Sequence, residues 1–243
     1  MHTFNVEMAG LTVQVNCHYP YTERFCRDYL TDKTADLSVT VSEEDIQQEI
    51  ELSPYNPRPA YAESICVYRA IAGQLPLYHR TVFHGAVISY GGNGYLFTAP
   101  SGTGKTTHIC LWQKYLDGVE IVNGDKPILR VENGEVEAYA TPYAGKERYQ
   151  NHGSVRIKGI CLLHRGEQNR IRRVKAGEVL REIVKQIYLP QETEPVVKTL
   201  DILNELLTTV PVYLLECDMS EEAVKTSFEA MTGEPYQRKE KAE

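Results

Sequence analysis

The sequence lacks the cysteine and histidine spacings that hold structural zinc. Its six cysteines are scattered along the chain and include no C-x-x-C pair. Unpaired cysteines are typical of a reducing compartment, where disulfides rarely persist. We therefore expect a cytoplasmic protein with free thiols at Cys17, Cys26, Cys66, Cys110, Cys161 and Cys217.

Long apolar runs and an excess of positive charge are also missing. No window approaches the roughly 20 apolar residues that cross a bilayer, and the N-terminal "MHTFNVEMAG" has no basic segment followed by an apolar stretch. The formal net charge of -7 opposes general attraction to nucleic acid or to an anionic membrane. We expect neither as a partner, so any phosphate binding is local.

What the sequence does contain is enough apolar material for an α/β fold. With 243 residues and 42% hydrophobic content, the chain can bury one substantial core plus a small appendage. We divide it into a small N-terminal α+β region at 1–58, a main domain with a mixed sheet at 59–233, and a polar, solvated tail at 234–243.

Local patterns place the elements of the N-terminal region. Apolar alternation on both sides of Ala9-Gly10 predicts two antiparallel strands, and Ser42 with Asp45 resembles a helix capping box. The remaining patterns predict helices near 21–30 and 60–75 and a strand near 36–41.

Further on, "VFHGAVISYGGNGYLFTA" predicts two strands around a turn, and "KPILRVENGEVEAYA" predicts a hairpin. We interpret "IKGICLLHRGEQNRIRRV" as another hairpin, with "RIRR" at 170–173 on an exposed edge strand. Apolar spacing predicts a helix at 105–116, two helices between 176 and 207, a strand at "VYLLEC" and a last helix around Val224.

The stretch "APSGTGKT", residues 99–106, has the spacing of a P-loop (Walker A) with Ala in place of the first Gly. It follows a predicted strand and begins a predicted helix, which is the context that this motif requires. Such a loop directs backbone N–H groups at phosphate, its Lys reaches the β- and γ-phosphates, and its Thr hydroxyl ligates Mg²⁺. We predict a nucleotide site at Ser101, Gly102, Thr103, Gly104, Lys105, Thr106 and Thr107.

Several classes of protein share this loop, and its position narrows them. Nucleotide kinases usually place it near the N-terminus, whereas here almost 100 residues precede it, and no LSGGQ-type stretch indicates a transporter ATPase. The chain resembles the HPr kinase/phosphorylase family, whose catalytic domain is similar to phosphoenolpyruvate carboxykinase. The resemblance covers roughly residues 80–165 and rests on "FHGAVISYGGNGYLFTAPSGTGKTT", "VEIVNGDKPIL" and "TPYAGKERYQN".

The resemblance implies an ATP- and Mg²⁺-dependent kinase of phosphoenolpyruvate-carboxykinase type. The acceptor that it implies is a serine hydroxyl on a small protein or peptide, and a small metabolite remains an alternative. The family often forms oligomers. Because the parts that choose the acceptor diverge, a nucleotide-gated binding module that transfers no phosphate is the competing hypothesis. The sequence does not distinguish ATP from GTP.

The resemblance also assigns residues outside the loop. Asp125 would bind Mg²⁺ and His84 would lie near the γ-phosphate, although the residue pattern alone also fits a plain turn and a packed histidine. The family usually has two adjacent aspartates where this chain has Gly124-Asp125. If Asp125 holds the metal, then His84 or another group must deprotonate the acceptor, or transfer is lost.

The Gly-Lys loop "AGKERYQN" supplies the last candidates. Lys146 and Arg148 could bind phosphate oxygens or an acidic acceptor, as cations do in phosphoryl transfer. The alternative is that both side chains lie in solvent, and we favour this alternative for Arg148. The predicted catalytic residues are therefore His84, Lys105, Asp125 and Lys146, and the predicted metal ligands are Thr106 and Asp125.

Overall fold

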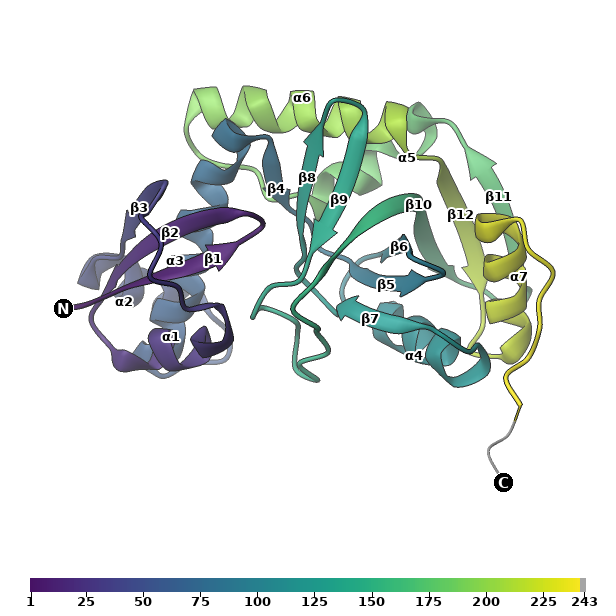
Figure 1. Cartoon of the computed structure of the whole chain (residues 1–243), viewed down its shortest axis with the longest axis horizontal. Helices are drawn as coiled ribbons and strands as arrows, with labels where there is room; N and C mark the ends of the chain where they lie inside the picture. Colours follow the sequence, from purple (N-terminus) through teal and green to yellow (C-terminus); the bar gives the residue numbers. More distant parts are fainter. Residues whose placement is uncertain (241–243) are drawn as a thin grey trace.

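The computed structural model describes residues 1–240, which fold into a mixed α/β protein with a three-stranded and a nine-stranded sheet (Figure 1). The small sheet lies at the N-terminal end of the molecule, and the large sheet curls through its centre. No helix in this part of the chain is long and apolar enough to cross a membrane. All six cysteines are free, as predicted.

The N-terminal sheet has the order β1-β2-β3. Strands β1 (His2–Met8) and β2 (Leu11–Cys17) form the predicted antiparallel hairpin, and β3 (Leu37–Thr40) runs parallel to β2. The predicted helix near 21–30 is a short helix α1 (Pro20–Phe25) followed by a 3-10 turn, η1 (Arg27–Tyr29).

The helices α2 (Glu43–Leu52) and α3 (Pro59–Gln74) cover this sheet. The capping box at the start of α2 is confirmed, because Ser42 and Asp45 exchange side-chain to backbone hydrogen bonds. Ile71 of α3 is fully buried in the same core cluster as the N-terminal strands. The domain division at residue 58 stays a prediction, and α3 shares the N-terminal core.

The large sheet has β10 at its centre, and Figure 1 shows its strong curl. β10 pairs antiparallel with β9 at its start and parallel with β6 and β12 further along. The strands are β4 (Arg80–Val82), β5 (Ala86–Tyr90), β6 (Asn93–Thr98), β7 (Glu120–Asn123), β8 (Ile128–Glu132), β9 (Glu135–Tyr139), β10 (Ser154–Arg165), β11 (Arg170–Val174) and β12 (Val212–Cys217).

The predicted hairpin of β10 and β11 is wrong. The late strand β12 lies between them and pairs with both, parallel to β10 and antiparallel to β11. The apolar "VYLLEC" tolerates this interior position, whereas the charged "RIRR" is suited to an edge. The predicted edge is confirmed, since among the described strands β11 pairs only with β12. The hairpin of β8 and β9 is also confirmed.

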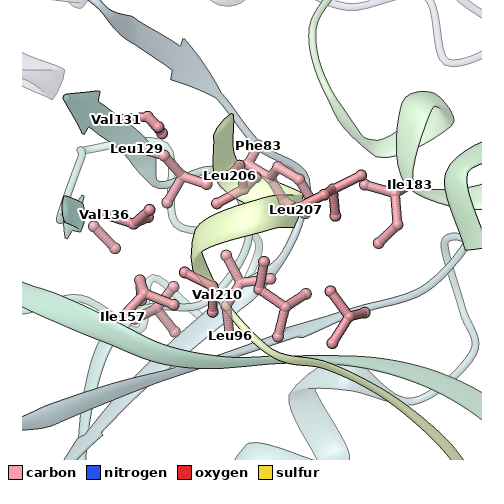
Figure 2. Packing of buried hydrophobic residues seen from close by; sticks show 14 of the residues in the cluster. Phe83, Leu96, Leu129, Val131, Val136, Ile157, Ile183, Leu206, Leu207 and Val210 are labelled. Carbon is pink, nitrogen blue, oxygen red and sulfur yellow. The ribbon is translucent and has the colours of Figure 1, made fainter. Parts of the chain in front are cut away.

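Helices cover both faces of the large sheet. Leu96 of β6 packs in one core cluster and its neighbour Phe97 in another, because successive strand residues point to opposite faces. Leu206 belongs to the first cluster (Figure 2) and Trp112 to the second. The predicted helices are α4 (Lys105–Tyr115), α5 (Ala176–Ile183), which continues into the 3-10 turn η3 (Val184–Gln186), α6 (Thr193–Thr209) and α7 (Glu221–Thr232).

The tail is polar, as predicted, but residues 234–240 are docked rather than freely solvated. The ring of Tyr236 lies edge-on to that of Phe228 with centroids 6.3 Å apart, and its hydroxyl donates to Glu221 at 2.9 Å. The Lys239 N–H donates to the Tyr115 carbonyl at 2.8 Å. Tyr236 anchors the segment, the other residues of 234–240 are exposed as expected for a solvated tail, and residues 241–243 lie outside the described part.

Candidate functional site

The glycine-rich loop joins the end of β6 to the start of α4, so strand, loop and helix follow one another as predicted. Gly102 has φ +78° and Gly104 has φ +124°, a region in which a side chain would be strained. Gly104 is also the N-cap residue of α4, and no side chain caps this helix start. The exposed helix N-terminus therefore presents its positive end beside the loop.

Lys105 lies folded back on the loop. Its Nζ donates to the Ala99 carbonyl at 2.9 Å, and the residue is buried. Burial lowers the pKa of Lys105, and the nearby charge of Asp125 partly offsets that effect. The ammonium group is thus held between the loop and Asp125, within electrostatic reach of both.

Arg165, at the end of β10, braces the loop from outside. Its guanidinium donates to the carbonyl of Thr103 at 3.0 Å and also to the carbonyl of Gly102. Sequence reasoning missed this residue, because a lone Arg at the end of a strand is usually solvated. Its bonds fix the loop through carbonyl groups, which leaves backbone N–H groups to an anion.

The turn after β7 carries Asp125, and Asn123 closes this turn. Asn123, not Asp125, closes the turn, since its Oδ1 accepts from the N–H groups of Asp125 and Lys126 at 3.0 and 2.9 Å. Asn123 in turn donates to the Thr141 carbonyl at 3.1 Å. The residue is indeed in a turn, yet its carboxylate is not used to build it.

The carboxylate of Asp125 lies between two cationic or polar groups instead. Its Oδ1 is 3.4 Å from Nε2 of His84, and its Oδ2 is 3.1 Å from Nζ of Lys126. Burial alone raises the pKa of Asp125, but the hydrogen bond from His84 and the charge of Lys126 outweigh burial and lower the pKa to about 2. The carboxylate is therefore ionised at neutral pH.

This lowered pKa gives a prediction with a defined sign. A carboxyl group with a lowered pKa keeps its charge below the usual value of 3.8, so Asp125 stays ionised from pH 7 to pH 4 and is protonated only near pH 2. Lys126→Gln removes one cause, and we expect the pKa to rise towards its usual value. Carboxyl-carbon NMR titration of both proteins measures this, and a wild-type midpoint near pH 4 would contradict the assignment.

His84 precedes β5 and is held from two sides. Its Nδ1 lies 2.8 Å from Oε1 of Gln186, its backbone N–H donates to the Gln186 carbonyl at 2.6 Å, and its Nε2 faces Asp125. Gln186 is buried in η3, and nothing in the sequence indicated its contact with a residue 102 positions away. The histidine is thus packed and oriented at once, with one ring nitrogen directed at the carboxylate.

Gly124 precedes Asp125 and is tightly packed against the loop after β9. A Cβ at this position would lie 3.0 Å from the Ala144 carbonyl oxygen and 3.3 Å from Cβ of Tyr149. The Gly124 N–H also donates to the Tyr149 carbonyl at 2.8 Å. A side chain at position 124 would therefore crowd the backbone of this loop.

We expect Gly124→Ala to destabilise the protein by about 1–3 kcal/mol through overpacking. Gly177 in α5 is the matched control, because a Cβ there meets nothing within 4 Å, and its replacement with Ala is expected to be neutral or stabilising. Urea unfolding of both variants measures the difference. Equal stability of the two variants would show that the loop after β9 shifts to accommodate a side chain at position 124.

The loop between β9 and β10 also brings Gly145 against Asp125. Gly145 has φ +82°, and a Cβ there would lie 3.3 Å from Cβ of Asp125. Lys146 and Arg148 follow, and both are exposed. Hydroxyl groups of Thr141 and Tyr68 both donate to the Lys126 carbonyl at 2.8 Å, so this loop and α3 are fastened to the Asp125 turn.

Two pockets lie beside these groups. The first, the loop pocket, has a volume of about 370 Å³ and includes Gly102, Gly104, Thr107, His108, Leu111, Leu163, Cys217 and Met219 in its lining. The second, the aromatic pocket, has a volume of about 510 Å³ and is lined by Asp125, Lys126, Lys146, Arg148 and the rings of Tyr21, Phe25, Tyr61, Tyr68 and Tyr143, among others. Asp125 thus borders one pocket, and the glycine loop borders the other.

Donors for a divalent cation are few. Within residues 1–240, no three His, Cys, Asp or Glu side chains gather into a metal-binding cluster. The half-buried Thr106 in the first turn of α4 and the ionised Asp125 are oxygen donors. Mg²⁺ typically takes only one or two protein oxygens and completes its shell with phosphate and water, so this donor set fits it.

Comparisons with known proteins add a distant likeness. No protein-family model matches the chain, and no curated protein matches its sequence. Among solved structures, the HPr(Ser) kinase/phosphatase from Coxiella burnetii is similar at 14% identity and a TM-score of 0.37, over 63% of this chain and 93% of that one. At this level of similarity the likeness does not assign the chain to a family.

Proposed function

We propose that the protein is an ATP- and Mg²⁺-dependent phosphotransferase that moves the γ-phosphate to a hydroxyl acceptor. The observation that supports this best is the alignment of three groups: a glycine-rich loop at a helix N-terminus, the buried Lys105 on that loop, and an ionised Asp125 within its electrostatic reach. Such groups together favour phosphate and its metal rather than a neutral ligand.

The positions of the two pockets indicate how the nucleotide would be oriented. We place the triphosphate on the loop and the base in the loop pocket, where Leu111, Leu163 and Met219 offer apolar surface. The γ-phosphate then points towards Asp125 and His84. The remaining aromatic pocket is left for the acceptor.

Each residue then has a role. Lys105 turns from the Ala99 carbonyl to the phosphate oxygens, and Thr106 and Asp125 hold Mg²⁺, which neutralises phosphate charge when bound. The acceptor oxygen attacks the γ-phosphorus, the bond to the β–γ bridging oxygen breaks, and ADP leaves. A carboxylate with a pKa of about 2 is a poor base. With Asp125 turned to the metal, a neutral His84 that keeps its proton on Nδ1, facing Oε1 of Gln186, would accept the hydroxyl proton at Nε2.

The acceptor is a hydroxyl of a small protein, a peptide or a metabolite. Lys146 borders the aromatic pocket with Asp125 and would bind oxygens of the acceptor or of the transferred phosphate.

A nucleotide-gated binding module is the second candidate. The packing at Gly124 favours it, since a side chain there would crowd the loop after β9, and the turn carries no second carboxylate to share the metal and proton tasks. In this alternative, ATP binding or slow hydrolysis would order a surface for a partner without phosphate transfer.

Labelled ATP separates the two. Purified protein and γ-labelled ATP are added to extract from its own organism, with Lys105→Ala as the control, and the products are split by size. We expect label on an acceptor that the control fails to modify, in the macromolecular or the small-molecule fraction. Label found only on ATP or free phosphate would reject phosphotransfer in favour of the binding module.

A further inference from the structure

We propose that the aromatic pocket binds the phosphate acceptor, and that this acceptor carries an aromatic or bulky apolar group and an acidic group beside its hydroxyl. This inference rests on the proposed function and adds the chemical class of the second substrate. The residues that line the pocket support it. They come from α1, α3, the Asp125 turn and the loop after β9.

The aromatic side of the pocket is rigid. The rings of Tyr68 and Tyr143 stack with centroids 3.8 Å apart, and Phe25 lies 5.1 Å from Tyr143. The hydroxyls of Tyr68 and Tyr143 donate to backbone carbonyls at 2.8 and 2.7 Å. Because their polar tips are already satisfied inside the protein, the rings offer apolar surface to a ligand.

Two more tyrosines extend this surface to the solvent. Tyr61 of α3 is half exposed, and Tyr21 of α1 meets it edge-on with centroids 6.4 Å apart. Aromatic and apolar side chains predominate in the lining of pockets that bind small ligands. They therefore favour an occupant with a large apolar group.

The other end of the pocket is cationic. Lys126 pairs with Asp125, while Lys146 and Arg148 form no ion pair within residues 1–240. Three cations thus stand against one carboxylate in the lining of a protein whose net charge is -7. This local excess of positive charge favours an anionic group on the occupant, since rim charges select partners by complementarity.

The volume limits the size of the occupant. Small-ligand pockets span about 300–1,000 Å³, and 510 Å³ lies in the lower half of that range. A small hydroxy acid with a ring fits this space, and so does one aromatic side chain of a peptide beside a serine and an acidic residue. Both sources share the same chemistry.

The pocket meets the reacting groups at the Asp125 turn. In Figure 1, the loop from β9 to β10 lies between the N-terminal sheet with its helices and the side of the large sheet next to α4. The lining residues of the pocket agree with this position. Asp125 belongs to the lining and is paired with His84. An acceptor in the pocket would therefore carry its hydroxyl towards the same residues that face the γ-phosphate.

Ligand-observed NMR on the full chain tests this without nucleotide. The small-molecule probe is 3-phenyllactate, with lactate lacking the ring and 3-phenyl-1,2-propanediol lacking the acid. The peptide probe is acetyl-Phe-Ser-Asp-amide, with acetyl-Ala-Ser-Asp-amide as its match. We expect 3-phenyllactate, the Phe peptide or both to bind at least about 5-fold more tightly than their matches, and the responding arm identifies the source.

Variants tie that binding to the pocket. Tyr61→Ala is expected to weaken the ring-bearing probes at least 5-fold, whereas Tyr55→Ala, at an exposed tyrosine outside the lining, leaves them unchanged. Lys146→Gln is expected to weaken the acidic probes but not the diol, with Lys198→Gln on α6 as its control. Binding that ignores Tyr61 and Lys146, or no preference for ring and acid in either arm, overturns the inference.

ATP binding is measured on the same samples with a fluorescent ATP analogue. If the analogue binds and no probe does, the nucleotide site stands and the acceptor class is wrong. If a probe binds as expected and the analogue does not, the pocket assignment stands and the phosphotransferase proposal is wrong.

Discussion

Replacing Lys105 with methionine is expected to weaken ATP binding by about 10- to 100-fold, as loss of a charged hydrogen bond to phosphate typically does. Methionine keeps the length of the side chain and its apolar contacts, so the buried site is not emptied. The variant gives up one charged hydrogen bond to the Ala99 carbonyl, which costs about 1.5–3 kcal/mol of stability. Calorimetric titration with ATP and Mg²⁺ measures the effect.

Lys114→Met is the matched control for this experiment. Lys114 is exposed on the last turn of the same helix, far along α4 from the glycine loop. We expect its affinity for ATP to equal that of the wild type. A Lys105 variant that binds ATP as tightly as the Lys114 variant would remove the loop from the nucleotide site.

Asp125→Asn is expected to lower phosphate turnover by about 100- to 1,000-fold, because a metal-held phosphate gains several kcal/mol of charge stabilisation. The amide keeps the shape of the side chain but removes the negative charge that pairs with Lys126 and that we propose holds the metal. We also expect saturation to require more Mg²⁺. Turnover measured across a Mg²⁺ titration, with nucleotide in excess, reports both changes.

The control here is Asp201→Asn, at an exposed position on α6. An Asp125 variant whose Mg²⁺ curve matches that of the Asp201 variant would return Asp125 to a purely structural role in its turn. Loss of ATP binding without a change in the Mg²⁺ curve would also contradict the metal assignment, since it would place the carboxylate on the nucleotide side alone.

The sequence predicted correctly those elements that short-range interactions along the chain determine. The hairpin around Ala9-Gly10, the capping box at Ser42 and the helix after the glycine loop each depend on residues close together in the chain. The error at β10 and β11 has the opposite cause. Their partner β12 begins almost 40 residues after β11 ends, and strand pairing over such a distance leaves no local pattern.

The residues of the candidate site also differ in how far the sequence could predict them. Spacing located the loop residues, and the family resemblance added Asp125; the roles of all these residues stay predictions. Gln186 and Arg165 could not be found, because each acts through a contact with a residue at least 62 positions away. The tyrosines of α1 and α3 lie in helices that the sequence predicts, and only the fold brings their rings to the Asp125 turn.

The hydrogen bonds that the Lys126 carbonyl accepts would couple the binding of the two substrates. This carbonyl accepts the hydroxyl of Tyr68, a ring of the aromatic pocket, and the hydroxyl of Thr141, at the base of the Gly-Lys loop. Any shift of Tyr68 on occupancy of the pocket is therefore passed to the peptide that carries Asp125. The two substrates of such an enzyme would not bind independently, and each would change the apparent affinity for the other by the same factor.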